Sequence, residues 1–177
     1  MIGRLERFLA FSSDVTAYSI FELRGTGLAQ AYLATVEEVV GRQVVDALLD
    51  RYDAAVAAAE GGGALPDLLR RELFSDLRLG PVARNLVKMW YLGIWYELPG
   101  AWTDAYGALP KNVAFTVSAA AYTEGLLWPS IGANPPGAKA PGYGSWASPP
   151  RIPARGPQWA PDPLPESTKT TTRRSPR

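Results

Sequence analysis

The 177-residue sequence contains neither cysteine nor histidine. Without these side chains there is no Cys/His zinc site, no thiolate ligand set for an iron–sulfur cluster and no C-x-x-C-H attachment site for haem. Ser-His-Asp and Cys-His catalysis are also excluded, and the general acid–base group best suited to neutral pH is missing. The two absences therefore remove several classes of metalloprotein and hydrolase from consideration.

Long apolar runs and strong net charge are also absent. The longest apolar run, Met89 to Tyr96, is much shorter than the roughly 20 residues that cross a bilayer, so we expect no direct membrane insertion. The net charge is +1, with six basic and two acidic residues from position 151 onward and 12 basic and 15 acidic residues before it. A mildly acidic body with no basic face argues against nucleic-acid binding.

Proline is scarce in the first two thirds of the chain, because twelve of the sixteen prolines lie at or after Pro129. Residues 1–128 are rich in Ala, Leu and Val at helical spacing, which predicts an all-α helical bundle. Residues 129–148 form an irregular Pro/Gly-rich arm with aromatic side chains. Residues 149–177 have little to pack, and we expect a disordered, Pro-rich basic tail.

The periodicity predicts where the individual helices lie. A short amphipathic helix opens the chain, a second helical segment ends at Gly25, and Thr26 is a candidate N-cap for the next helix. Gly41 interrupts or bends that helix, and residues 60–63 form a linker. Further helices are expected from Pro66, from Pro81 through Leu98, and over residues 112–128, whereas strand signals are weak throughout.

Two patterns that resemble chemical motifs have a simpler explanation. The glycines of RGTGLAQA at residues 24–31 suggest a phosphate loop, but Gln30 stands where the dinucleotide pattern needs a small residue and no strand precedes it. We therefore interpret this segment as the entry to a helix. Asp46, Asp50 and Asp53 share one helical face, which is typical of a solvated surface with neighbouring arginine partners.

Two aromatic segments have no such simple explanation. The helix expected over residues 86–98 is apolar on nearly all sides, with Gly93 at its centre, where a closely approaching backbone would favour glycine. It is either a core helix or a surface for another protein, and the arm packs either on its own bundle or on a partner. The predicted partner contacts are Trp90, Tyr91, Trp95 and Tyr96 on the helix, and Trp128, Pro135, Pro136, Tyr143 and Trp146 on the arm.

These segments resemble a known family. MWYLGIWY, AAAYTEGLLWPSIGANPPGAKAPGYGSWASPP and FELRGTGLAQAYLATV are similar to parts of the small subunit of membrane-bound, FAD-containing sugar and polyol dehydrogenases of the D-sorbitol dehydrogenase kind, including gluconate, glucose and fructose dehydrogenases. The resemblance extends from about Phe8 to Pro150. It implies a large partner subunit that binds FAD and oxidises the sugar, often with a cytochrome c subunit, at the periplasmic face of the inner membrane.

The resemblance also implies what this chain does. Such a small subunit has no cofactor and no catalytic or metal-binding residues of its own, and it binds, stabilises and helps to mature the catalytic subunit. The absence of His and Cys agrees with that role. Members that act in export carry a twin-arginine signal, which this sequence does not show, so a cytoplasmic location is the alternative.

Two other functions remain open from the residues alone. One is a stand-alone helical enzyme that uses carboxylates and tyrosines, with Tyr122 and Glu124 as its candidate acid–base residues. The other is an adaptor whose proline-rich tail binds aromatic grooves as a polyproline II helix.

Overall fold

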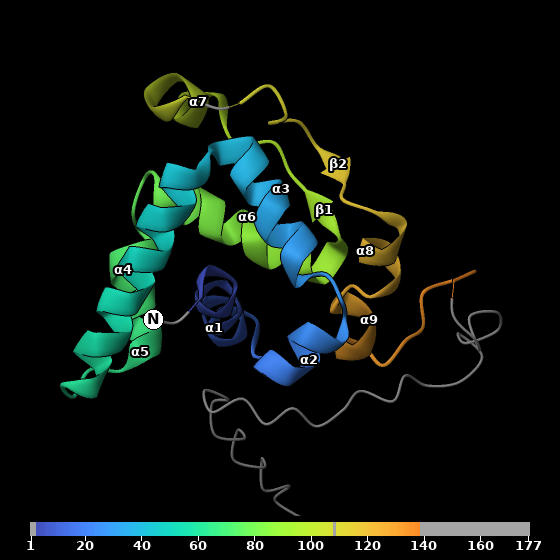
Figure 1. Ribbon diagram of the computed structural model, residues 1–177, viewed down its shortest axis with the longest axis horizontal. Coiled ribbons are helices and arrows are strands. Elements are labelled where there is room, and N and C mark those ends of the chain that lie inside the picture. The colour runs from blue at the N-terminus through green and yellow to red at the C-terminus, as the bar shows by residue number, and fades with distance from the viewer. Residues whose placement is uncertain (1–2, 108, 139–177) are drawn as a thin grey trace, which may run out of the picture.

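The computed structural model describes residues 3–107 and 109–138, and within them the predicted all-α fold is confirmed. Figure 1 shows the helices in a bundle. They are α1 (Arg4–Thr16), α2 (Ile20–Gly25), α3 (Ala29–Val40), α4 (Arg42–Glu60), α5 (Leu65–Leu68), the π-helical segment η1 (Leu69–Phe74), α6 (Leu79–Leu92), α7 (Gly100–Tyr106), α8 (Ala119–Thr123) and α9 (Leu127–Ser130). Two short strands, β1 (Ile94–Trp95) and β2 (Phe115–Thr116), pair antiparallel.

Helix α6 forms the centre of the core. It packs against α1, α3 and α4, and its residue Trp90 is fully buried. The Trp90 ring lies edge-on to Tyr32 of α3, with ring centroids 4.8 Å apart, and is stacked with Phe8 of α1 at 6.3 Å. Such large rings dominate the energetics of a core because each buries roughly 150–250 Å².

Local signals set most helix boundaries as expected. Ser19 caps α2 in a reciprocal capping box with Glu22, and α2 ends at Gly25. Gly41, with φ 84°, separates α3 from α4. The prediction of Thr26 as the N-cap of the next helix is wrong: its hydroxyl accepts a hydrogen bond from the Leu28 N–H, but α3 begins at Ala29, with Leu28 at the N-cap position. The interpretation of RGTGLAQA as a helix entry is confirmed.

Two helix predictions are wrong at the C-terminal half. Helix α6 ends at Leu92 rather than Leu98, because Gly93 takes the left-handed conformation with φ 70° and the chain continues as β1. A Cβ at Gly93 would lie 2.5 Å from the Ala121 carbonyl oxygen, so the expected close backbone approach is confirmed although the continuous helix is not. Residues 112–128 form β2, α8 and the start of α9 instead of one helix.

Asp50 and Asp53 of α4 are exposed, as predicted, whereas Asp46 is half-buried, and the arginine partners of all three lie on α1. Arg7 bridges Asp50 and Asp53 with N–O distances of 2.6 and 2.7 Å, and Arg4 pairs with Asp46 and with Glu37 of α3. The Asp50 hydrogen bond and the two negative charges raise the pKa of Arg7. These ion pairs join α1 to α3 and α4. Because the carboxylates are partly or largely exposed to solvent, each pair contributes only modestly to stability.

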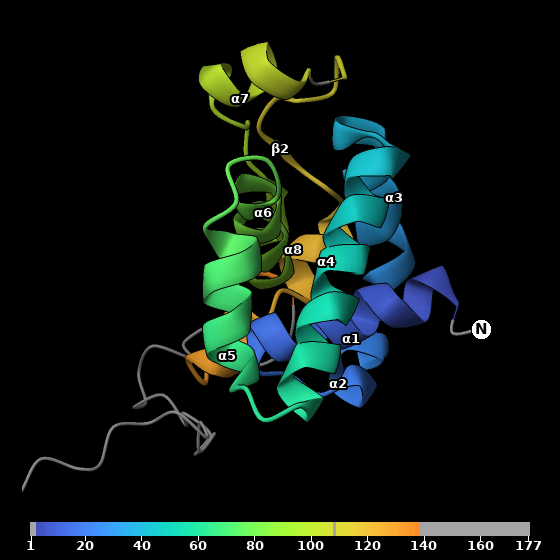
Figure 2. The same ribbon diagram turned by 90° about the vertical axis from the view of Figure 1, so that its left-hand side faces the viewer.

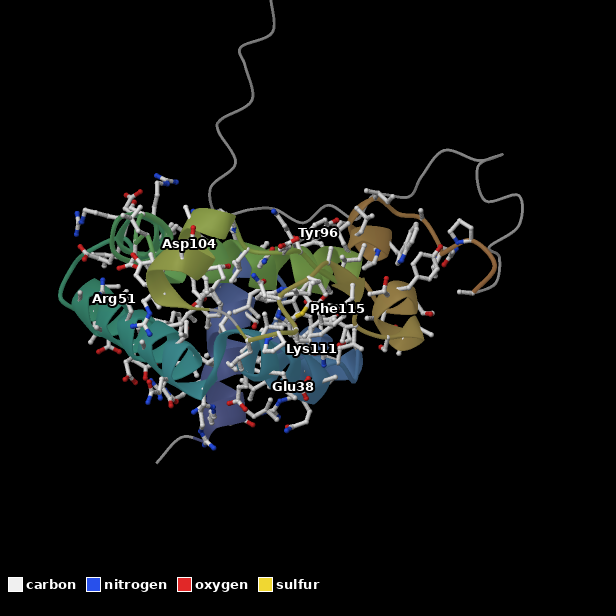
Figure 3. All side chains as sticks on the ribbon, turned by 90° about the horizontal axis from the view of Figure 1, so that it is seen from above. Glu38, Arg51, Tyr96, Asp104, Lys111 and Phe115 are labelled. Carbon is white, nitrogen blue, oxygen red and sulfur yellow. The ribbon has the colours of Figure 1, made fainter. Side chains whose placement is uncertain are left out.

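The bundle has two distinct ends. Helix α7 lies at one end and α2 with α9 at the other, as the two perpendicular views show (Figures 1 and 2). Near the α7 end, Lys111 pairs with Glu38 of α3 and lies over the Phe115 ring (Figure 3). Helix α9 spans the expected boundary at residue 128 between bundle and arm, and the predicted tail lies outside the described residues.

Candidate functional site

A groove of about 410 Å³ lies at the α2 and α9 end of the bundle. One wall comes from α2 and the residues around it, and the other comes from the end of α8, from α9 and from the chain that follows. We call it the C-terminal groove, and it is lined by Tyr18, Glu22, Gly25, Thr26, Thr123, Glu124, Gly125, Leu126, Trp128, Pro129, Ala133, Asn134 and Pro135. Its volume is in the range of cavities that accept a small ligand or a few side chains.

Hydrogen bonds from Tyr18 hold the two walls together. The Tyr18 hydroxyl lies 3.1 Å from the Leu126 carbonyl oxygen, to which it donates, and 2.7 Å from the Ser130 hydroxyl. The Leu126 N–H in turn donates to the Trp90 carbonyl near the end of α6, at 3.0 Å. These hydrogen bonds fix the second wall both to Tyr18, shortly before α2, and to the central helix α6.

Gly125 lets that second wall approach α6 closely. A Cβ at this position would lie 2.8 Å from the Tyr91 carbonyl oxygen, which is closer than side-chain carbons come to backbone oxygens. The sequence therefore needs glycine here, directly after the acidic residue Glu124 at the groove edge.

Trp128 forms the aromatic part of the second wall. Its indole N–H donates to the Tyr122 carbonyl oxygen at 2.6 Å, and its ring lies edge-on to the Tyr122 ring with centroids 5.4 Å apart. Pro135 is buried at the groove, and Pro136 follows it on the surface. Trp128 is half-buried, so part of this ring stays available to another group.

The groove is apolar with a negative edge. Glu22 and Glu124 contribute two carboxylates, and none of the described residues that line it is a lysine or arginine. Arg24 of α2 does not line the groove and pairs with Glu6 of α1. This combination suits an apolar or aromatic segment that carries positive charge.

Exposed apolar side chains continue from the two walls. On α2, Phe21 is 86% exposed and Ile20 is 37% exposed, and on the other side Tyr122 and Ile131 are 40% and 41% exposed. Phe21 and the groove-lining Gly25 are four residues apart on α2, which places them on the same side of the helix. The groove and these four residues together form the strongest candidate surface for binding another molecule.

The structure separates the nine predicted contact residues. Trp90 and Trp95 are fully buried, so their assignment as surface contacts is corrected: both are core residues. Trp90 packs between Phe8 of α1 and Tyr32 of α3, and Trp95 lies in β1, which follows the turn at Gly93 and pairs with β2. Tyr91 and Tyr96 are half-buried; the Tyr91 hydroxyl donates to the Thr16 carbonyl at 2.8 Å.

The arm residues divide differently. Trp128 and Pro135 line the C-terminal groove and Pro136 lies beside it on the surface, whereas Tyr143 and Trp146 lie outside the described residues. The acid–base candidates Tyr122 and Glu124 lie on this same wall. The Tyr122 ring packs against Trp128, and Glu124 lines the groove.

Sequence reasoning missed the contribution of α2. Helix α2 is only six residues long and carries three large apolar residues, of which Leu23 alone is buried. A helix this short can bury only one of its sides. Because Ile20, Phe21 and Leu23 cannot all lie on that side, their presence in the sequence indicates that some apolar surface stays exposed.

Other chemistry is not apparent in the part of the chain that the structure describes. Within residues 3–107 and 109–138 there is no group of acidic side chains arranged to hold a metal ion. Among the same residues, no helix combines the length and apolar character needed to cross a bilayer. Burial raises the pKa of Tyr32 and of Tyr52, and the hydrogen bond from Tyr52 to Asp14, 2.5 Å, raises the second further.

Comparisons of the chain with protein-family models, with curated proteins and with solved structures give no match.

Proposed function

We propose that this chain is a non-catalytic binding subunit that attaches to the FAD-containing catalytic subunit of a sugar or polyol dehydrogenase and stabilises it. In this proposal FAD belongs to the partner, a cytochrome c subunit accepts the electrons, and the complex works at the periplasmic face of the inner membrane. The proposal rests on the sequence resemblance and on the surface around the C-terminal groove.

One observation gives the main support for this proposal. Two of the three segments that resemble the small subunits, one beginning at Phe21 and the other at Ala119, are nearly 100 residues apart in the sequence and supply residues to the two walls of one groove, whereas the third, Met89–Tyr96, places Trp90 and Trp95 in the core. A resemblance caused by packing in the core alone would not need to converge on an open surface. Its convergence there favours selection for contact with another molecule.

Phe21 is the side chain whose burial by a partner would release the most free energy. It is 86% exposed, and covering a phenylalanine fully is worth about 1.5–3 kcal/mol. Tyr122 and Ile131 continue the apolar area, and Tyr and Phe are enriched where proteins meet. We therefore place Phe21 at the centre of the proposed interface, and Tyr91, Tyr96, Trp128, Pro135 and Pro136 remain proposed contributors through the surface or the groove wall that they form.

The direct test is co-expression with an FAD-containing sugar or polyol dehydrogenase subunit from the same organism, followed by size-exclusion chromatography monitored at the flavin absorbance. We expect the two proteins to elute together, and we expect the flavoprotein to contain less flavin when this chain is omitted. A flavoprotein that folds, binds its flavin fully and elutes alone in the presence of this chain would contradict the proposal.

A further inference from the structure

We propose that the C-terminal groove binds a segment of this same chain, residues 139–155, through the aromatic side chains of Tyr143 and Trp146 and through its basic residues. The proposal concerns the chain by itself and does not rest on the binding-subunit function. It assigns an occupant to the groove from the position of the described C-terminal end and from the charges of the two parts.

The first argument is where the described chain ends. Pro135 lines the groove, and a tight turn follows, in which the Ala138 N–H donates to the Pro135 carbonyl oxygen at 3.1 Å and Gly137 has φ 73°. A turn closed by this bond, with Pro136 and Gly137 at its centre, reverses the direction of the chain. The described chain therefore ends beside the groove, and residues just before its end already form part of the wall.

The second argument is reach. Tyr143 is eight residues beyond Pro135 and Trp146 is eleven, so a chain with at most about 3.6 Å per residue spans every part of the groove with length to spare. A ligand joined by so short a connection has an effective concentration in the millimolar range. Even a weak affinity of the groove for this segment then gives substantial occupancy.

The third argument is chemical complementarity. The sequence of residues 139–155 is KAPGYGSWASPPRIPAR, with two large aromatic residues, three basic residues and no acidic residue. The groove offers the half-buried ring of Trp128 and the exposed Pro129, together with the carboxylates of Glu22 and Glu124, and no lysine or arginine is among its lining residues within the described chain. In the bound arrangement that we propose, the aromatic side chains of the segment contact the apolar part of the groove. Its basic side chains lie near the two carboxylates.

The absence of native cysteine gives a clean test in the full-length chain, because two introduced cysteines are the only ones present. Gly25→Cys places a thiol in the groove at a position where a Cβ meets no atom within 4 Å, and Ser145→Cys places the second beside Trp146. Leu77→Cys with Ser145→Cys is the comparison, because Leu77 is 80% exposed and lies outside the groove lining. Disulfide formation in dilute protein, with oxidised glutathione added as the two-electron oxidant, is followed by mass spectrometry.

We expect the groove pair to form an intramolecular disulfide about tenfold faster than the comparison pair. Adding Tyr143→Ser and Trp146→Ser to the groove pair should remove this advantage, because a merely tethered segment does not depend on those rings. Equal rates for the two pairs, an advantage that survives loss of both aromatic residues, or a disulfide between two copies of the chain would each overturn the proposal.

A variant that fails to fold does not end the test. The helical circular dichroism signal of each variant is compared with that of the unmodified chain. If Gly25→Cys loses that signal, Thr123→Cys supplies a thiol from the opposite wall of the groove, with the same expected result. Glu124→Gln in the same background should slow the reaction if charge contributes, and an unchanged rate would limit the proposal to the aromatic contacts.

Discussion

The indole N–H of Trp90 donates a hydrogen bond to the hydroxyl of Ser12 at 2.9 Å, and both side chains are fully buried. The bond joins α6, the central helix, to α1 and satisfies the one polar side-chain atom of this buried tryptophan. Because Phe8 and Tyr32 pack against the same ring, it also fixes how this aromatic cluster is arranged.

Ser12→Ala should therefore lower the free energy of unfolding by about 1–3 kcal/mol, because it leaves the Trp90 N–H buried without its partner. Denaturant unfolding monitored by tryptophan fluorescence measures this loss. Thr116→Ala, at an exposed position of β2, is the control and should change the value by less than about 0.5 kcal/mol. Equal effects of the two substitutions would show that the Trp90–Ser12 bond contributes little.

Gly93→Ala should be much more destabilising than Gly27→Ala, although the two glycines have nearly the same φ, 70° and 71°. Both substitutions carry the cost of a left-handed residue, about 1–2 kcal/mol, but only at Gly93 does the new Cβ meet the Ala121 carbonyl oxygen. We expect a further loss of about 1–3 kcal/mol at Gly93, measured by denaturant unfolding. Similar losses for the two variants would mean that α8 moves away at no cost.

The free energy of unfolding should fall as the pH rises above about 10, the ordinary pKa of tyrosine. Burial raises the pKa of Tyr32 and Tyr52 in the folded chain above that of the unfolded chain. Their contribution is therefore fully present below pH about 10 and is lost as the pH rises toward the folded-state pKa, by up to about 1.4 kcal/mol per pH unit for each residue.

Tyr32→Phe separates this effect from other alkaline titrations. The Tyr32 hydroxyl is buried and has no hydrogen-bond partner within the described chain, so we expect the variant to be as stable as the parent at neutral pH or more stable. We also expect a shallower loss of stability at alkaline pH, measured by urea unfolding across that range. A slope identical to that of the parent would show that Tyr32 does not titrate with unfolding.

The sequence predicted the parts of the fold that depend on local signals. The spacing of apolar residues predicted most of the helices, and glycine predicted the boundary between α3 and α4 at Gly41. The structure confirms both, and it also confirms that residues 24–31 lead into a helix. The close approach at Gly93 was also predictable, because a glycine in an apolar run is costly unless another backbone needs the space.

The surface was less predictable, because burial is decided by contacts between distant segments. An aromatic run such as Met89–Tyr96 has the same composition whether its rings enter the core or face a partner. In this chain Trp95 is fully buried, and it lies in a strand that pairs with a segment about 20 residues later. The groove likewise needs Tyr18 to bond Leu126 across 108 positions of sequence, a relationship that no local pattern carries.

The most direct test of the binding-subunit proposal is the effect of Phe21→Ala on binding of the flavoprotein, with Leu77→Ala as the matched control. Both residues are large, apolar and at least 80% exposed, so neither change should lower the melting temperature of the free chain appreciably. We expect Phe21→Ala alone to weaken binding by about tenfold or more, measured by titration calorimetry. Unchanged affinity in the Phe21 variant, or equal losses in both, would contradict an interface centred on α2.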